Sequence, residues 1–259
     1  MIDWVDSLSI VPLVLVVCAL MALVTVAIYL VVTRLAAAGR GDALAAVSPG
    51  FLPPMSLVFG LLVGFLAAGV WSNTSSAQQA VDNEASALRS VELLDRDFPA
   101  ADQRQMDLLI RSYIQSAVNH EWPAMAHQTA TLVVASPQLS AAEQLALRLP
   151  ADNPGRMVAQ REIVTSLEAA FNARRQRIIL SQSSVNSAKW TGVIALGILT
   201  LIAIACVHSP NRRAAAITLT LFAVAIVVSL LMIAVQDRPF AGPYRVQPTP
   251  LVQVEPHAA

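Results

Sequence analysis

The sequence predicts an all-α membrane protein with four transmembrane spans and one helical domain inserted between spans two and three. Three observations lead to this fold class: a high hydrophobic content, four long apolar runs, and a middle segment with a polar helical pattern. Of the 259 residues, 56% are hydrophobic and only 13% are charged, too few charges to cover a soluble protein of this size. The formal net charge is zero, so the composition does not suggest a nucleic-acid partner.

Four apolar runs are long enough to cross a hydrocarbon core of about 30 Å as helices that rise about 1.5 Å per residue. The predicted spans cover about residues 10–33, 51–71, 190–207 and 214–235. None of them contains Asp, Glu, Lys, Arg or His. Trp4, Trp71 and Trp190 lie at predicted boundaries, where indole rings favour the headgroup region. The lipid bilayer is therefore a predicted partner, and the spans form two transmembrane hairpins, residues 1–71 and 190–236.

The segment 72–189 differs from the spans in having nearly balanced charge, almost no glycine and apolar residues at helical spacing. Its first helix follows span two without a breaker until Phe98-Pro99, and its last helix, from about Pro154, leads toward span three. We therefore predict a helical bundle domain at 72–189, in which spans two and three continue as long extramembrane helices. A proline-rich tail, residues 237–259, follows the last span.

The short loops carry the arginines that bear on orientation. Arg34 and Arg40 follow span one, and Arg212 and Arg213 lie between spans three and four. The positive-inside rule places both loops in the cytoplasm, and therefore the central domain outside.

Span two carries a face of small residues that continues into uncharged polar residues. Gly60 and Gly64 form a GxxxG pair, which allows close helix approach in lipid. Around a symmetry axis, such a helix would line a pore with an apolar constriction and a polar mouth that tolerates anions. The candidate pore-lining residues are Gly60, Gly64, Phe65, Ala68, Ser72, Ser75 and Ser76. A helix-packing face with a solvated exit is the alternative interpretation.

A second candidate region combines an acidic, an aromatic and several basic residues of the central domain. As a functional site, it would be a contact surface for a partner or an anion. As a structural feature, it would be a helix end at which Trp122 packs and Glu121 pairs with an arginine. The residues concerned are Glu121, Trp122, Arg174, Arg175 and Arg177.

The sequence gives no sign of enzyme chemistry. It has no arrangement of Ser-His-Asp or Cys-His that predicts a nucleophile, no Gly-rich phosphate loop and no metal-binding spacing. We therefore predict no enzyme activity, no cofactor and no metal site. Proton-coupled transporters and intramembrane enzymes usually need ionisable residues within the membrane, and these spans have none.

Several ordered motifs resemble those of one family. They are Trp71 followed by Ala77, Ala80, Val81, Glu84-Ala85 and Leu88; Tyr113 with Glu121-Trp122-Pro123-Ala124-Met125; His208-Ser209-Pro210-Asn211-Arg212-Arg213; and Asp237-Arg238-Pro239-Phe240-Ala241-Gly242-Pro243-Tyr244-Arg245-Val246. With these motifs the chain resembles the bestrophin-like domain family of mainly bacterial membrane proteins, over nearly its whole length.

The resemblance implies a distant kinship with bestrophins, which are pentameric anion channels with four spans per subunit. In bestrophins the second span lines the pore and extends into a helical domain in the cytosol, so the resemblance and the arginine count leave both orientations open. The chain is thus expected to be a homo-oligomer, a pentamer, that passes small anions across the plasma (inner) membrane of a bacterium. The alternative is a non-conducting scaffold or sensor whose helical domain binds a partner.

Overall fold

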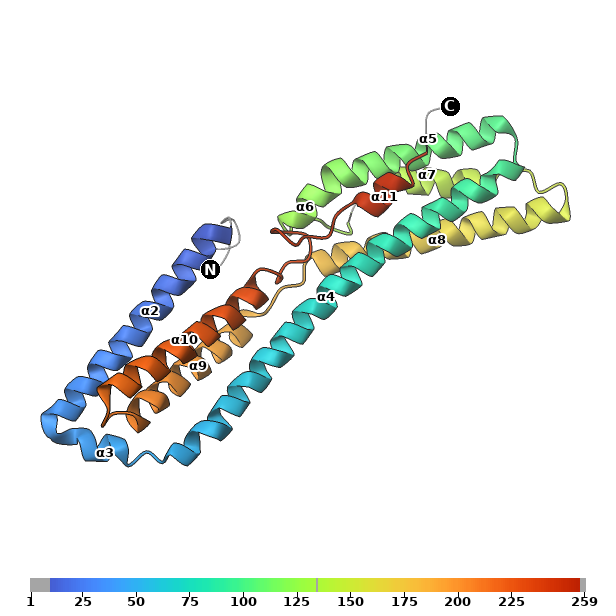
Figure 1. The fold of residues 1–259 in the computed structure, drawn as a ribbon. Helices are drawn as coiled ribbons and strands as arrows, with labels where there is room; N and C mark the ends of the chain where they lie inside the picture. Colours follow the sequence, from blue (N-terminus) through green and yellow to red (C-terminus); the bar gives the residue numbers. More distant parts are fainter. Residues whose placement is uncertain (1–9, 134, 257–259) are drawn as a thin grey trace. The chain divides into compact units, whose positions relative to one another are not determined.

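The structure, a computed structural model, describes residues 10–133 and 135–256, and every regular element within them is helical (Figure 1). Four helices in these ranges are long and apolar enough to cross a membrane. They are α2 (Ile10–Leu35), α4 (Leu52–Leu94), α9 (Ser187–Val207) and α10 (Arg212–Ala234). The all-α class with four spans is therefore confirmed.

The chain divides into two compact units. The membrane unit comprises Met1–Trp71 and Ser184–Asp237, and the extramembrane unit comprises Ser72–Ser183 and Arg238–Ala259. The short elements of the membrane unit are η1 (Ala36–Arg40), α3 (Gly41–Ala45) and η2 (Pro49–Phe51). The extramembrane unit contains the second part of α4, then η3 (Asp95–Asp97), α5 (Ala100–Ser116), η4 (Ala117–Glu121), α6 (Trp122–Ala126), α7 (Pro137–Ala146), α8 (Pro154–Ser181) and α11 (Thr249–Gln253).

In the membrane unit, α10 packs against both α2 and α9 (Figure 1). One side of α4 joins their shared apolar cluster through Phe59, Leu66 and Val70, and the Phe59 and Phe222 ring centroids are 5.7 Å apart. Of the three tryptophans predicted at boundaries, Trp190 packs against this cluster, Trp71 is half exposed, and Trp4 lies outside the described residues.

Among the glycines of the four spans, Gly197 of α9 lies closest to neighbouring helices. A Cβ atom placed on it would lie 3.3 Å from Ile226 Cδ1 of α10 and 3.3 Å from Phe59 Cε2 of α4. At Gly192, on the same helix, such a Cβ would meet no neighbouring atom of the described residues within 4 Å. The side chains of Ile226 and Phe59 therefore leave little room for a larger residue at Gly197, in the close packing that holds helices together in lipid.

Helix α4 is a single helix of 43 residues, so the predicted continuation of span two beyond the membrane is confirmed. At about 1.5 Å per residue it is about 65 Å long. No proline interrupts it after Pro54, and it ends before Pro99, whose ring disfavours helical geometry in the preceding residue.

The structure differs from the expectation at the start of span three, which does not continue α8. Helix α8 ends at Ser181, and α9 begins only at Ser187. Local polar side chains stabilise this break: Ser183 Oγ donates to Leu180 O at 2.6 Å, and Asn186 Oδ1 accepts from Ala188 N at 2.9 Å as the cap of α9. These hydrogen bonds replace those of a continuous helix.

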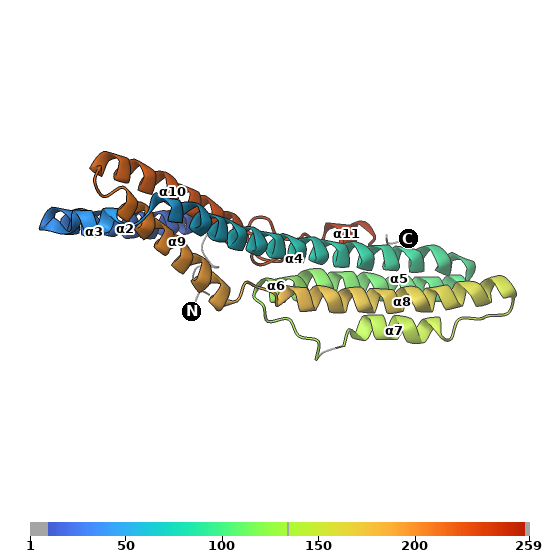
Figure 2. The ribbon, with the colours of Figure 1, turned by 90° about the horizontal axis from the view of Figure 1, so that it is seen from below.

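The extramembrane unit is a bundle in which α7 packs against both α5 and α8 (Figure 2). Its core also includes residues of the carboxyl-terminal tail, since Phe240, Val246 and Leu251 are buried among the helices. Arg111 Nε of α5 donates to Pro256 O at 3.0 Å. Residues 238–256 of the tail are therefore part of this folded unit.

We expect Gly197→Val to destabilise the protein, because the added methyl groups overlap Phe59 and Ile226. Overpacking of this kind typically costs about 1–3 kcal/mol. The measurement is thermal unfolding of the full chain in detergent. Gly192→Val, the matched control on the same helix, is expected to melt close to the unsubstituted protein; equal losses in both variants would contradict the packing analysis.

Candidate functional site

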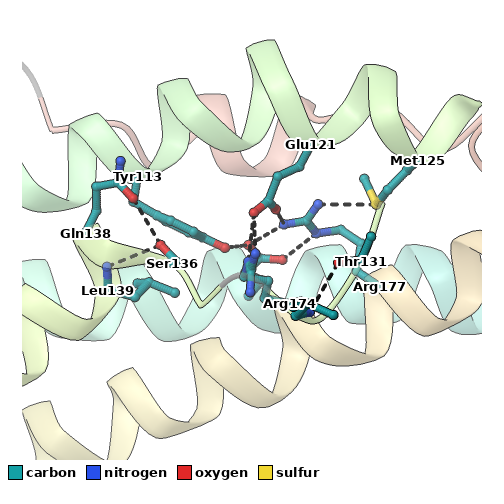
Figure 3. A network of polar contacts seen from close by, with 11 residues as sticks. Tyr113, Glu121, Met125, Thr131, Ser136, Gln138, Leu139, Arg174 and Arg177 are labelled. Carbon is teal, nitrogen blue, oxygen red and sulfur yellow. Dashed lines mark hydrogen bonds and ion pairs between the residues drawn. The ribbon is translucent and has the colours of Figure 1, made fainter. Parts of the chain in front are cut away.

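The extramembrane unit contains a network of charged and polar side chains in its interior (Figure 3). This buried ion network consists of Glu84 on α4, Tyr113 on α5, Glu121 on η4, and Arg174 and Arg177 on α8. Glu84 and Arg177 are fully buried, Tyr113 is 1% exposed, and Arg174 is 8% exposed. Polar contacts thus join α4, the consecutive segments α5 and η4, and α8.

Arg177 and Glu84 form the centre of the network. Arg177 Nε donates to Glu84 Oε2 at 2.8 Å and Arg177 Nη2 donates to Glu84 Oε1 at 3.1 Å, which makes the pair bidentate. Tyr113 Oη donates a further hydrogen bond to Glu84 Oε1. Both carboxylate oxygens of Glu84 are therefore satisfied without water.

Glu121 joins the two arginines (Figure 3). Its Oε2 accepts from Arg177 Nη2 at 2.9 Å, and its Oε1 accepts from Arg174 Nε at 2.8 Å. Burial opposes ionisation of Glu121, but the charges of Arg177 and Arg174 and their hydrogen bonds outweigh it and lower the pKa of this carboxyl group.

Arg177 and Tyr113 are held in their usual protonation states. Burial works against the charged guanidinium of Arg177, but Glu84 outweighs it and the pKa of Arg177 is raised. Burial, and then the neighbouring charge of Glu84, raise the pKa of Tyr113 well above its ordinary value. Two carboxylates thus face two guanidinium groups, and Tyr113 stays neutral as a hydrogen-bond donor.

Trp122 connects the network to the carboxyl-terminal tail. The guanidinium carbon of Arg177 lies 4.6 Å from the centre of the Trp122 ring, a cation–π contact. The indole Nε1 donates to Val246 O at 3.1 Å, and the ring meets Phe240 edge-on with centroids 5.8 Å apart. The tail is therefore docked on the residue that covers the buried arginine.

This arrangement suits a structural role better than ligand binding. The third guanidinium nitrogen of Arg177, Nη1, is 3.4 Å from Met125 Sδ, so each of the three nitrogens has a partner. Of the five residues predicted as a contact surface, Arg175 is exposed, Glu121 is partly exposed, and Trp122, Arg174 and Arg177 are buried. Glu121 pairs with arginines and Trp122 packs, as the structural interpretation expected.

Glu84 and Tyr113 are the network residues that the sequence analysis did not identify as a site. A signal for Glu84 exists: it lies on the apolar stripe of α4 that includes Val81 and Leu88, both buried. A carboxylate on a buried helix face predicts a buried cationic partner, because an unpaired ion there is too costly.

The candidate pore-lining residues of span two lie on the side of α4 that is exposed among the described residues. Gly60, Gly64 and Ala68 are exposed, and Phe65 is 74% exposed. Apart from the backbone of α4 itself, no atom of the described residues would lie within 4 Å of a Cβ atom placed on Gly60 or Gly64. This span-two face, defined as Gly60, Gly64, Phe65 and Ala68, is therefore open to a surface or solvent outside the chain.

The next turns of α4 carry the polar candidates. Ser72 and Ser75 are exposed and Ser76 is partly exposed, whereas Ala77 and Val81 on the other side of the helix are buried in the extramembrane unit. Hydroxyl groups thus continue the exposed side of the helix beyond its apolar part. Within the described residues, no group of three His, Cys, Asp or Glu side chains could hold a metal ion.

Asp95, in η3, is a second buried carboxyl group, and its surroundings differ from those of Glu84. It is 4% exposed, and its Oδ2 atom has no hydrogen-bond partner among the described residues. Burial, together with the negative charges of Asp107 and Glu92, raises its pKa from 3.8 to about 7, although Arg96 acts in the opposite direction. Asp95 therefore takes up a proton near neutral pH.

Comparisons with known proteins agree with this architecture. A family model described as the Bestrophin-like domain matches residues 19–251. A comparison with proteins of curated function gives no match.

Three solved structures of a bacterial bestrophin homologue from Klebsiella pneumoniae are similar in fold. One substituted variant has a TM-score of 0.71 at 10% identity, over 93% of this chain and 96% of that one. A second variant has a TM-score of 0.70 at 9% identity, over 93% and 97%. A further structure of that homologue has a TM-score of 0.69 at 10% identity, over 93% and 95%. At such low identity the likeness concerns the fold alone.

Replacing Arg177 by Met is expected to destabilise the extramembrane unit by about 3–5 kcal/mol, because it leaves Glu84 buried without its cation. Arg175→Met, at an exposed site two residues away, is the matched control, with an expected change within about 0.5 kcal/mol. Thermal unfolding of the full chain in detergent compares the two. Adding Glu84→Gln to Arg177→Met is expected to recover part of the loss; equal stability of both arginine variants would refute the network's role.

Asp95→Asn is expected to stabilise the protein at alkaline pH. Between pH 3.8 and about 7 the folded protein keeps the Asp95 proton that the unfolded chain loses, so stability falls as pH rises through this window. Asparagine has no proton to lose, and the variant should lack this decline. Melting temperatures from about pH 5 to about pH 8 test this. Asp97→Asn, exposed in the same turn, is the control and should keep the decline; an unchanged slope in Asp95→Asn would contradict the raised pKa.

Proposed function

Because the chain belongs to the bestrophin-like domain family, we propose that it forms an oligomeric anion channel in which the span-two helix lines the pore. The single observation that carries the proposal is the span-two face. On this face of a membrane helix, three small residues and Phe65 are exposed, and no other described helix approaches Gly60 or Gly64, while the other side of the helix is packed. A symmetric assembly would bring such faces together around a common axis.

Phe65 gives the proposed pore its constriction. Of the bulky apolar residues of span two, Phe59 and Leu66 are buried in the membrane unit, and Phe65 is the most exposed, ahead of Leu57, Val58 and Leu61. A ring of phenylalanines would form an apolar neck, and hydrophobic constrictions of this kind gate ions by excluding water. Ser72, Ser75 and Ser76 would then supply neutral hydroxyl donors that anions tolerate.

The composition of the spans supports passive conduction. No predicted span contains Asp, Glu, Lys, Arg or His, the residues on which intramembrane proton relays usually depend. We therefore propose that the protein acts as a channel and not as an enzyme. It would work as a homo-oligomer, a pentamer by analogy with bestrophins, in the inner membrane of a bacterium, with small anions such as chloride as its substrates.

We expect the purified full chain to mediate chloride flux when reconstituted in liposomes, and Phe65→Ala to increase this flux several-fold by widening the neck. Leu221→Ala is the matched control, because Leu221 is an exposed apolar residue of another span, α10. Its flux should equal that of the unsubstituted protein. The flux is measured as the rate of chloride efflux from the liposomes, with valinomycin present so that potassium ions balance the charge.

Two outcomes would overturn the channel proposal. One is tight vesicles that contain correctly folded oligomer. The other is a monomer or dimer in native mass measurements, because neither can surround a five-fold axis. Either result would favour the alternative of a non-conducting scaffold or sensor.

A further inference from the structure

The membrane unit contains an apolar groove that is lined by α2, α9 and α10. It has a volume of about 270 Å³, and only one of the residues that line it is charged. Leu13 and Met21 of α2 and Leu230 of α10 form a buried base, whereas Leu20 and Ile194 are 60% and 41% exposed. The groove therefore opens to the surroundings of the chain, which are lipid along the membrane spans.

The groove covers about one half of the membrane thickness. Trp190 lies in the first turn of α9 and Asp237 follows the end of α10, so both mark the headgroup level at one end of the groove. At about 1.5 Å per residue, the lining extends about 12 Å from Trp190 to Ile198 on α9, and about 16 Å from Leu13 to Val24 on α2. A hydrocarbon core of about 30 Å gives each leaflet about 15 Å. The groove thus has the depth of one leaflet.

The mouth of the groove combines an indole ring with a carboxylate. Asp237 Oδ1 accepts a hydrogen bond from Val185 N at 2.7 Å, so this oxygen is engaged in fixing the segment before α9. The indole N–H of Trp190 suits the ester carbonyl of a phospholipid, which lies at this depth. A free fatty acid would place its own carboxylate beside that of Asp237, and like charges repel. The mouth therefore favours an esterified chain over a free acid.

We propose that this groove binds one acyl chain of a bilayer phospholipid, with the ester group at Trp190 and the chain end near Val24 and Ile198. An apolar cavity of about 150 Å³ is large enough for benzene, and this groove is larger. A chain in the groove contacts three helices at once, so it gains more dispersion energy than a lipid on the surface of a single helix. This inference does not depend on whether the protein conducts.

The extent of the groove favours a lipid chain over a helix from a second copy of the protein. Helix α2 has 26 residues, from Ile10 to Leu35, and the lining ends near its middle, at Val24. A helix that packs beside α2 would contact it along most of the span, whereas the chain of a lipid in one leaflet ends at the middle of the bilayer. The groove therefore matches a chain that enters from one side of the membrane.

Native mass spectrometry of the full chain, delipidated in detergent and then titrated with a long-chain phosphatidylglycerol, tests the proposal. The unsubstituted protein is expected to hold one lipid per chain. Ala234→Phe, which adds a ring at a lining position, should weaken this binding by about ten-fold, the usual effect of overpacking an apolar site. Ala225→Phe, at an exposed position of the same helix outside the lining, is the matched control and should bind the lipid as the unsubstituted protein does.

The depth of the groove provides a second test. Val24→Phe closes its inner end, so it should bind a long-chain phosphatidylglycerol about ten-fold more weakly and keep its affinity for a short-chain one. Val26→Phe, at an exposed position of α2 outside the lining, is the control and should change neither affinity. In the unsubstituted protein, a phospholipid with a photoreactive group at the end of its acyl chain should label α2 near Val24 and α9 near Ile198.

Equal lipid binding by Ala234→Phe and Ala225→Phe, an equal response of both chain lengths to Val24→Phe, or labelling elsewhere would overturn the proposal. Palmitate that binds as tightly as the phospholipid would contradict the preference for an ester. Loss of an oligomer in Ala234→Phe with unchanged lipid binding would assign the groove to a second copy instead. Size-exclusion profiles check that the variants fold, and the labelling of the unsubstituted protein decides the question without any variant.

Discussion

Placing Arg177 beside Glu84 removes two full charges from water, and the extramembrane unit is arranged to compensate for that loss. Desolvation costs several kcal/mol per ion and is offset only when every donor and acceptor finds a partner. Here the partners come from different segments: Glu84 from α4, Glu121 from η4, and Met125 from α6. A shift of one residue in any of these helices would leave a buried charge without compensation. The pair therefore fixes the register of the bundle, and Trp122 extends this constraint to the tail.

Helix α4 meets two solvents without interruption, and its composition changes where the solvent does. In the membrane unit its packed side is Phe59, Leu66 and Val70, all apolar. In the extramembrane unit the packed side consists of small and branched apolar residues around Glu84. Uncharged hydroxyl and amide residues lie between these parts. Such residues tolerate both the headgroup layer and water, so no break in the helix is needed.

The sequence predicted the spans well because their signal is local. A run of apolar residues without charge is sufficient evidence for a span, whatever the rest of the chain does. The end of α8 could not be predicted in this way. Ser183 and Asn186 are both compatible with a helix. The break between α8 and α9 depends on the hydrogen bonds that these two side chains make, and on a third in which Val185 N donates to Asp237 Oδ1 at 2.7 Å. Asp237 lies 52 residues after Val185 in the sequence, so this contact is not visible in the local pattern. The Arg177 network also depends on residues distant in sequence, so the sequence left two interpretations open: a contact surface for a partner, or a helix end at which Glu121 pairs with an arginine.

The span-two face has a consequence for the assembly of the protein. A helix side made of Gly60, Gly64 and Ala68 gains little from contact with lipid, because it offers few atoms for packing and exposes backbone. The chain has another tight position of this kind, Gly197, and there the neighbouring helices fill the space. No helix of the described chain fills the space at Gly60 and Gly64. Two environments suit such a face: a second copy of the chain, or the water of a pore. An oligomer with a central pore supplies both, which is why we favour a channel over an isolated scaffold.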